Sequence, residues 1–218
     1  MSDLEATIRL FQSRRSNEMT PGQAKFQLAL TKLLAEGKPV SAQRLSDLIG
    51  DPVEFVVTSL QQMQASGCEF NEKGELIGCA LTLTPTRHQI KVDGSTLYAW
   101  CALDTLFLPA YIGKPAQITS TCPVTGTNIS LTITPRAIEM VQPAQTVLSV
   151  MTAEQCTSGI EGTFCSQVYF FASAEAAKQW VGDRSDFAIL TVAEAYEFAQ
   201  EFYIRPLLRQ LPPMTLSQ

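Results

Sequence analysis

Cys101, Asp104 and Cys165 have residue types and spacing suited to thiol chemistry. The first two lie in LYAWCALDTLFLP, residues 97–109, where a carboxylate follows a thiol by three residues in an apolar segment. Positions three apart share one face of a helix. Burial disfavours the charged form of a carboxylate, so Asp104 could take a proton from Cys101 near neutral pH and return it. The residues alone leave another interpretation equally open, in which Asp104 caps a helix or faces solvent and Cys101 packs in the core.

Cys165 lies in TFCSQVYFF, a segment whose aromatic and β-branched content predicts a strand. Alternation along a strand would place Cys165, Gln167, Tyr169 and Phe171 on one face. Cys165 is far from Cys101 in the sequence, so only the fold can bring the two thiols together.

The other cysteines, at positions 68, 79, 122 and 156, belong to no Cys-x-x-Cys motif. Zinc ribbons and thioredoxin-type redox sites therefore have no direct support. Cys68, Cys79 and Cys156 are predicted to be small packing residues. Cys122 begins a CPVTG turn and is predicted to be a buried structural thiol. The single histidine, His88, excludes a histidine-rich metal site.

The composition indicates a globular, acidic protein. Among 218 residues, 45% are hydrophobic and 17% charged, with a net charge of −5. This charge favours neither nucleic acid nor an anionic membrane as a partner. The N-terminus does not resemble a signal peptide, and no segment approaches the roughly 20 apolar residues of a membrane span. We therefore expect a cytoplasmic protein with reduced cysteines.

Residues 1–80 predict a helical, winged-helix-like subdomain. One helix follows Thr20 and Pro21, a second is capped by Ser41 and ends at Gly50, and a third occupies 51–66 with Asp51 as its cap. A hairpin follows in CEFNEKGELIGCALTLT. The 51–66 helix has no Lys or Arg, whereas DNA affinity depends on neutralising phosphates. The sequence favours a helical cap on the rest of the protein over a DNA-binding unit.

Residues 81–218 predict a catalytic core of the α+β class, with antiparallel or mixed sheets and flanking helices. The expected strands lie in ALTLTPTRHQIKVDG, on both sides of CPVTG, in TVLSVM and in FCSQVYFFAS. The expected helices are the 97–109 segment capped by Ser95 or Thr96, then AEAAKQWVG, and TVAEAYEFAQEFYIRPLL ending near Pro206.

LYAWCALDTL at 97–106, with the FLPAYIG that follows, closely resembles the active-site segment of organomercurial lyases (alkylmercury lyases). The resemblance covers approximately residues 38–210. It includes KPVSAQRLSDLIGDP, GELIGCALTLTPT, CPVTGTNISLTITP, FCSQVYFFAS and AQEFYIRPLL.

The resemblance implies roles for the candidate residues. Cys101 matches the first catalytic cysteine, Asp104 the catalytic aspartate and Cys165 the second cysteine, with all three around the mercury, while Cys122 matches a structural cysteine. Some members have another cysteine directly after the second one, where this chain has Ser166.

The implied reaction is protonolysis of a carbon–mercury bond, which gives a hydrocarbon and Hg(II) held by thiolates, the ligands that soft metals prefer. The resemblance further implies a role in mercury detoxification without a cofactor, release of Hg(II) to exogenous thiols, and mercuric reductase as the acceptor. A non-catalytic thiol carrier of heavy metals is the alternative. It would need Cys101 and Cys165 but not Asp104.

Overall fold

The computed structural model describes residues 3–14, 19–152 and 164–211. Its helices are α1 (Asp3–Arg14), α2 (Pro21–Leu34), α3 (Ala42–Ile49), α4 (Val53–Ala65), α5 (Asp104–Ile112), α7 (Ala174–Val181), α8 (Val192–Ala199) and α9 (Arg205–Arg209). Its strands are β1 (Glu69–Phe70), β2 (Leu76–Cys79), β3 (Leu81–Thr82), β4 (His88–Val92), β5 (Ser95–Ala99), β6 (Ala116–Thr121), β7 (Asn128–Ile133), β8 (Ile138–Gln142), β9 (Val147–Met151), β10 (Phe170–Phe171) and β11 (Phe187–Thr191). A 3₁₀ turn, η2 (Cys165–Gln167), and a π-helical turn, η3 (Gln200–Ile204), complete these elements.

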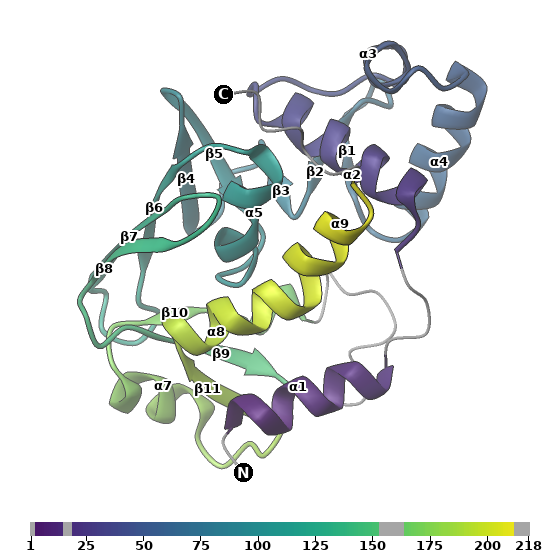
Figure 1. The fold of residues 1–218 in the computed structure, drawn as a ribbon. Helices are drawn as coiled ribbons and strands as arrows, with labels where there is room; N and C mark the ends of the chain where they lie inside the picture. Colours follow the sequence, from purple (N-terminus) through teal and green to yellow (C-terminus); the bar gives the residue numbers. More distant parts are fainter. Residues whose placement is uncertain (1–2, 15–18, 153–163, 212–218) are drawn as a thin grey trace, which may run out of the picture.

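The strands form two antiparallel sheets (Figure 1). The larger has eight strands in the order β1-β2-β3-β5-β4-β6-β7-β8, and the smaller has three in the order β10-β9-β11. In Figure 1, α5 lies beside the large sheet, and α8 and α9 run diagonally between α5 and the smaller sheet. This arrangement confirms the predicted α+β class.

The helices α2 to α4 form as the sequence predicts, because their ends carry clear capping signals. Thr20 and Gln23 make a capping box at the start of α2, and Ser41 caps α3 through the Arg44 amide. Gly50 ends α3 in the left-handed conformation, with φ 75°. One detail differs: Pro52 occupies the N-cap position of α4 and no side chain caps this helix, so the predicted Asp51 cap is wrong.

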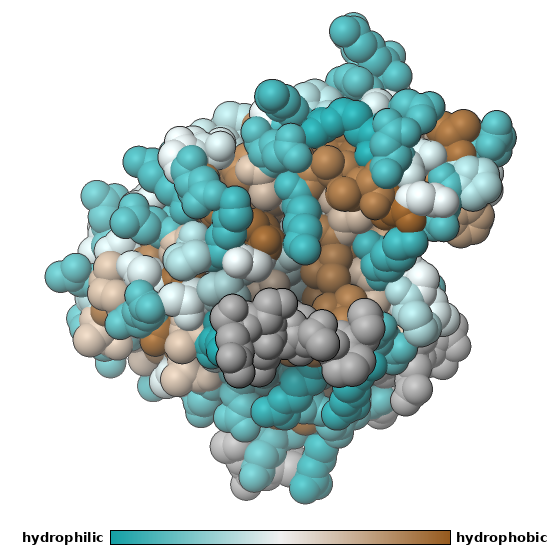
Figure 2. Space-filling model, turned by 45° about the horizontal axis from the view of Figure 1, so that its top comes forward, coloured by the Kyte–Doolittle hydropathy of each residue, from teal (hydrophilic) through white to brown (hydrophobic). Residues whose placement is uncertain are grey.

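The surface of α4 is consistent with the preference for a helical cap over a DNA-binding unit. Phe55 and Val57 are 56% and 39% exposed, and the helix contains no basic residue. In Figure 2, hydrophobic side chains gather across the middle of the face shown, with hydrophilic ones around them. A helix surface without basic residues cannot neutralise phosphates.

Helix α1 packs on the smaller sheet, against β11 and α8, and lies apart from α2 to α4 (Figure 1). The Phe11 ring meets those of Phe164, Phe198 and Phe202 edge-on, with centroids 6.0, 5.0 and 5.8 Å away. Since Phe164 directly precedes Cys165, α1 supports the segment that carries this thiol.

The segment before Cys101 is a strand and not the predicted helix. Asp93 and Gly94 both have positive φ, 47° and 80°, the geometry of a tight two-residue hairpin turn. Ser95 therefore begins β5, which pairs with β4 in the register Val92↔Ser95 to His88↔Ala99. The helix starts only at Asp104.

The C-terminal helix continues beyond its predicted end near Pro206. The π-helical turn η3 precedes α9, and Arg205 donates its backbone N–H to Gln200 O, five residues earlier. Pro206 then lies in the first turn of α9, where a missing N–H is tolerated. No helix among the described residues has both the length and the apolar character needed to cross a membrane.

Candidate active site

Cys101 is positioned by the end of β5 and the start of α5. Trp100 donates its backbone N–H to Ala80 O at 3.0 Å, which keeps the chain on the sheet up to the residue before Cys101. The chain then turns. Thr105 Oγ1 donates to Ala102 O at 2.7 Å, and this bond closes the turn that leads into α5.

Cys165 lies in the 3₁₀ turn η2, so the predicted strand around it is wrong. Within this segment, the strand that pairs with β9 consists of Phe170 and Phe171. Just before them, Ser149 donates its backbone N–H to Tyr169 O at 3.1 Å. Its hydroxyl donates to Gln167 O at 2.8 Å and accepts from the Tyr169 N–H at 3.1 Å. The strand that the aromatic residues predict is therefore present only at the end of the segment, at Phe170 and Phe171.

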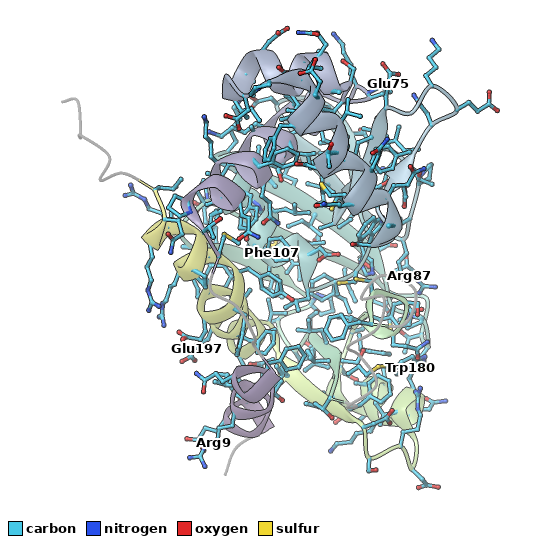
Figure 3. All side chains as sticks on the ribbon, turned by 90° about the vertical axis from the view of Figure 1, so that its right-hand side faces the viewer. Arg9, Glu75, Arg87, Phe107, Trp180 and Glu197 are labelled. Atoms are coloured by element: carbon cyan, nitrogen blue, oxygen red, sulfur yellow. The ribbon has the colours of Figure 1, made fainter. Side chains whose placement is uncertain are left out.

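Tyr169 holds this turn from the outside. Its hydroxyl donates to Ser166 O, and its ring lies beneath the Arg87 guanidinium, 4.6 Å from Cζ to the centroid. The Trp180 ring meets it edge-on at 5.4 Å. Figure 3 shows Arg87 and Trp180 one above the other along the same side of the molecule. The residue after Cys165 is thus fixed by a side chain that is itself held by two others.

The structure brings the three predicted residues together. The Ala102 N–H donates to Val168 O at 3.1 Å and joins the segment of Cys101 to that of Cys165. The two Sγ atoms and an Asp104 carboxylate oxygen all lie within 4.8 Å of one another. All three residues are buried, with exposed fractions of 0% for Cys101, 7% for Asp104 and 6% for Cys165.

Asp104 contacts Cys101 through the backbone. The Cys101 N–H donates to Asp104 Oδ2 at 3.0 Å. The prediction that both residues lie on one helix face is wrong, because Cys101 precedes the helix and Asp104 begins it. A carboxylate in the first turn of a helix is stabilised by the positive end of the helix dipole.

Burial and nearby groups keep the Cys101 thiol protonated at rest. Burial raises the pKa of the Cys101 thiol well above its ordinary value, and the hydrogen bond to Cys165 and the charge of Asp104 raise it further. Burial likewise raises the pKa of Tyr203, with added contributions from Asp104, Cys101 and Cys165. A metal that binds sulfur here must displace a proton, and Asp104 is the nearest base.

Tyr203 is a site residue that the sequence does not indicate. Its ring stacks on Phe107 at 4.5 Å between centroids and 10° between planes. Figure 3 shows Phe107 in the interior, between helices and sheet. The π-helical turn η3 positions Tyr203, and no pattern in the sequence predicted this turn. Asp104, Cys101 and Cys165 act electrostatically on the Tyr203 hydroxyl, so the ring that stacks on Phe107 belongs to a residue beside the site.

Glu69 is a second residue missed by sequence reasoning. Its carboxylate accepts from Trp100 Nε1 at 2.6 Å and from the hydroxyls of Thr82 and Thr84 at 2.7 and 2.8 Å. Gly78 leaves room for it: a Cβ there would lie 2.7 Å from Glu69 Oε2. Glu69 therefore fixes the side chain of the residue before Cys101.

The remaining cysteines lie elsewhere. Cys122 is 1% exposed in a turn where its N–H donates to Thr127 O at 2.9 Å. Burial opposes the pKa shift of Cys122, but hydrogen bonds from the Thr125 hydroxyl and the Ala172 N–H lower its pKa. Cys156 lies outside the described residues. Cys68 and Cys79, predicted as separate packing residues, contact each other with sulfurs 2.6 Å apart.

The site can hold a soft metal ion. Within the described ranges, Cys101, Asp104 and Cys165 are the group of three Cys, His, Asp or Glu residues whose donor atoms gather closely enough for one ion. Two sulfur donors select soft, thiophilic metals over Mg²⁺ or Ca²⁺, which prefer oxygen.

Two family models match the chain. One, described as alkylmercury lyase, matches residues 81–204, and the other, described as the helix-turn-helix domain of alkylmercury lyase, matches residues 5–80. The chain belongs to the alkylmercury lyase family. The expected family is therefore confirmed, and the chain is an enzyme of the alkylmercury lyase type.

Relatives and a solved structure agree with this assignment. Alkylmercury lyase from Staphylococcus epidermidis is 40% identical over 81% of this chain and 80% of the relative. That from Pseudomonas putida is 41% identical over 78% of each, and that from Streptomyces lividans 38% over 84% of each. A crystal structure described as the mercury-bound form of MerB2 aligns with a TM-score of 0.72 at 23% identity. It covers 94% of this chain and 98% of that one, and it supports the fold.

Proposed function

We propose that this alkylmercury lyase cleaves carbon–mercury bonds by protonolysis, with Cys101 and Cys165 as mercury ligands and Asp104 as the proton carrier. The observation that supports these roles is the buried cluster of two thiols and one carboxylate within 4.8 Å. Thiolates are the ligands that a soft metal such as mercury prefers.

The first step is exchange of a proton for mercury at Cys101. A thiol must lose its proton to become a ligand, and the raised pKa of Cys101 means that the proton needs an acceptor. Asp104, hydrogen-bonded to the Cys101 amide, accepts it while the sulfur binds R–Hg⁺. Cys165 then binds mercury as the second thiolate, and its proton leaves to the medium.

The second step breaks the carbon–mercury bond. Two sulfur donors increase the electron density on mercury and weaken its bond to carbon. The electron pair of that bond remains with carbon, which takes the proton from Asp104 and leaves as R–H. Mercury stays as Hg(II) on two thiolates, and the Asp104 carboxylate is again ionised and close enough to act as a further ligand.

The apolar surroundings suit this sequence. The stacked rings of Phe107 and Tyr203 can receive an organic group, and the buried position of all three groups limits the entry of water.

The family resemblance implies the release step and the cellular context. We expect no cofactor, removal of Hg(II) by exogenous thiols, and mercuric reductase as its acceptor in mercury detoxification. Because the mechanism needs reduced thiols, a cytoplasmic location is expected. Ser166 in place of a further cysteine leaves release to Cys101, Cys165 and the exogenous thiol.

Asp104 distinguishes a lyase from a thiol carrier of heavy metals. Purified protein would be incubated with methylmercury and excess thiol, and headspace methane measured by gas chromatography. We expect methane from the wild type and at least about 10²-fold less from Asp104→Asn, the usual scale for loss of a general acid and base. Asp93→Asn, at an exposed aspartate whose side chain is 63% accessible, is the matched control and should resemble the wild type.

Mercury retained without methane by the wild type would instead establish a carrier. Equal methane from wild type and Asp104→Asn would contradict the role of Asp104 while leaving a lyase in place.

A further inference from the structure

Cys68 and Cys79 form a second pair of neighbouring thiols. Cys68 follows α4 and donates its backbone N–H to Met63 O at 3.0 Å, and Cys79 ends β2. The register Glu69↔Gly78 places them at the next opposed positions of the β1–β2 hairpin. The Cys68 and Cys79 Sγ atoms lie 2.6 Å apart.

The two sulfurs are already close to the separation of a covalent bond. A disulfide has a sulfur–sulfur distance of about 2.05 Å and requires Cβ atoms that face each other, as opposed residues of an antiparallel pair do. A short approach within the hairpin is therefore enough, with no change in pairing.

The pair is also accessible from one side. Cys79 is half-buried, whereas Cys68 is buried with 7% exposed. A small disulfide can therefore reach Cys79 from solvent. Cys68, which is more buried, is the residue that then completes the Cys68–Cys79 bond. This division into an accessible and a resolving thiol is typical of redox-active pairs.

The hairpin supports the catalytic strand. Glu69, next to Cys68, accepts the indole N–H of Trp100 at 2.6 Å, and Ala80, next to Cys79, accepts its backbone N–H at 3.0 Å. Both acceptors of the residue before Cys101 therefore lie beside the two thiols.

We propose that Cys68 and Cys79 are a redox-active dithiol, closed to an intramolecular disulfide by a low-molecular-weight disulfide, and that this bond fixes the hairpin under Trp100. The pair contains neither Cys101 nor Cys165, and the proposal does not rest on the roles proposed for those two residues.

The reaction balances in two exchanges. The Cys79 thiolate attacks one sulfur of the small disulfide, forms a mixed disulfide and releases one small thiolate. The Cys68 thiolate then attacks Cys79 Sγ, forms the Cys68–Cys79 bond and releases the second small thiolate. The pair is oxidised by two electrons, the small disulfide is reduced to two thiols, and the two protons lost by the cysteines go to those thiolates.

A tryptic digest can test directly for the Cys68–Cys79 disulfide. Trypsin cleaves after Lys73, between the two cysteines, and gives peptides 45–73 and 74–87, which contain Cys68 and Cys79 as their respective single cysteines. Reduced full-length protein would be incubated with glutathione disulfide, alkylated, digested without reductant and analysed by mass spectrometry. We expect a linked 45–73/74–87 pair that reductant separates.

Matched variants identify the order of events. Cys68→Ser should accumulate glutathione on Cys79, whereas Cys122→Ser and Cys101→Ala should give the same linked pair as the wild type. Peptides 45–73 and 74–87 that stay unlinked and alkylated in the wild type would overturn the proposal. A stable glutathione adduct on Cys79 of the wild type would overturn it as well.

The coupling to Trp100 has its own measurement. In Trp180→Phe, Trp100 is the remaining tryptophan, because the chain has two. Oxidation should shift its fluorescence emission in this variant but not in Trp180→Phe combined with Cys68→Ser. An equal emission before and after oxidation would overturn the coupling.

Discussion

Two pairs of cysteines lie close together in the part of the chain that the structure describes, and their surroundings separate two kinds of thiol chemistry. Cys68 and Cys79 are brought together by a local hairpin, and one of them is half-buried. Cys101 and Cys165 meet through the tertiary fold, are both buried, and share a carboxylate. A pair of sulfurs alone supports exchange with another sulfur. The added carboxylate supplies what bond cleavage needs, namely a place to hold a proton between two steps.

The strongest way to test this contrast is to remove one thiol from each pair. We expect Cys101→Ala or Cys165→Ala to lower methylmercury cleavage by at least about 10³-fold, since loss of a group that bonds to the reacting atom removes the pathway. Cys68→Ala should stay within about threefold of the wild type. Methane formation and circular dichroism of the purified variants check activity and fold together. Wild-type turnover in either active-site variant would refute the two-thiol mechanism.

A smaller effect should follow from the contact between the two regions. Glu69→Ala removes the acceptor of the Trp100 indole and should lower kcat about tenfold with little change in KM, because it misplaces Cys101 without removing it. Glu69→Gln keeps a carbonyl acceptor for the indole and should recover most of this loss. Steady-state kinetics of both variants provide the comparison. If alanine and glutamine reduced kcat equally, the hydrogen bond to Trp100 would not be the cause.

The smallest effect concerns stability in acid. His88 pairs with Ala99 ahead of Cys101, and its ring lies 5.9 Å from that of Phe170, so it touches both active-site segments. Burial, with the Arg87 charge adding to it, lowers the pKa of His88 from 6.5 to about 3. The unfolded chain therefore binds a proton that the folded protein excludes, and stability is full above pH 6.5 and falls toward pH 3.

Between pH 7 and pH 5 the wild type should lose about 2 kcal/mol of unfolding free energy through His88, at about 1.4 kcal/mol per pH unit below the unfolded pKa. His88→Asn, which cannot titrate, should lose correspondingly less. Urea unfolding at the two pH values measures the difference. Parallel pH profiles would show that another group controls acid stability.

The sequence allowed the prediction of elements whose ends carry local signals. The capping box at Thr20, the Ser41 cap and Gly50 define α2 and α3 by hydrogen bonds within a few residues. The β5 strand and the turn at Cys165 were mispredicted because their conformation depends on partners. The β5 strand forms because the tight turn at Asp93 pairs it with β4. The turn at Cys165 is held by hydrogen bonds to Ser149 on β9. The boundary at residue 80 stays a prediction.

In the candidate site, too, local features could be predicted and tertiary contacts could not. Residue types and the family resemblance indicated Cys101, Asp104 and Cys165, but nothing in the local pattern showed that the thiols meet. That meeting depends on the bond from Ala102 to Val168, which joins segments far apart in the chain. Glu69 and Tyr203 were missed for a similar reason, because their importance arises from contacts and not from their own neighbours.

Gly78 shows how a rule for stabilising strands could damage this enzyme. Glycine weakens a strand, and replacing it by alanine commonly stabilises a protein by limiting the unfolded chain. At position 78 the added methyl group would lie 2.7 Å from Glu69 Oε2 and from Thr82 Oγ1, so the carboxylate would have to move away from the Trp100 indole. A thermostability design guided by strand propensity would select Gly78→Ala. This substitution would weaken the positioning of Cys101, although residue 78 is not part of the mercury site.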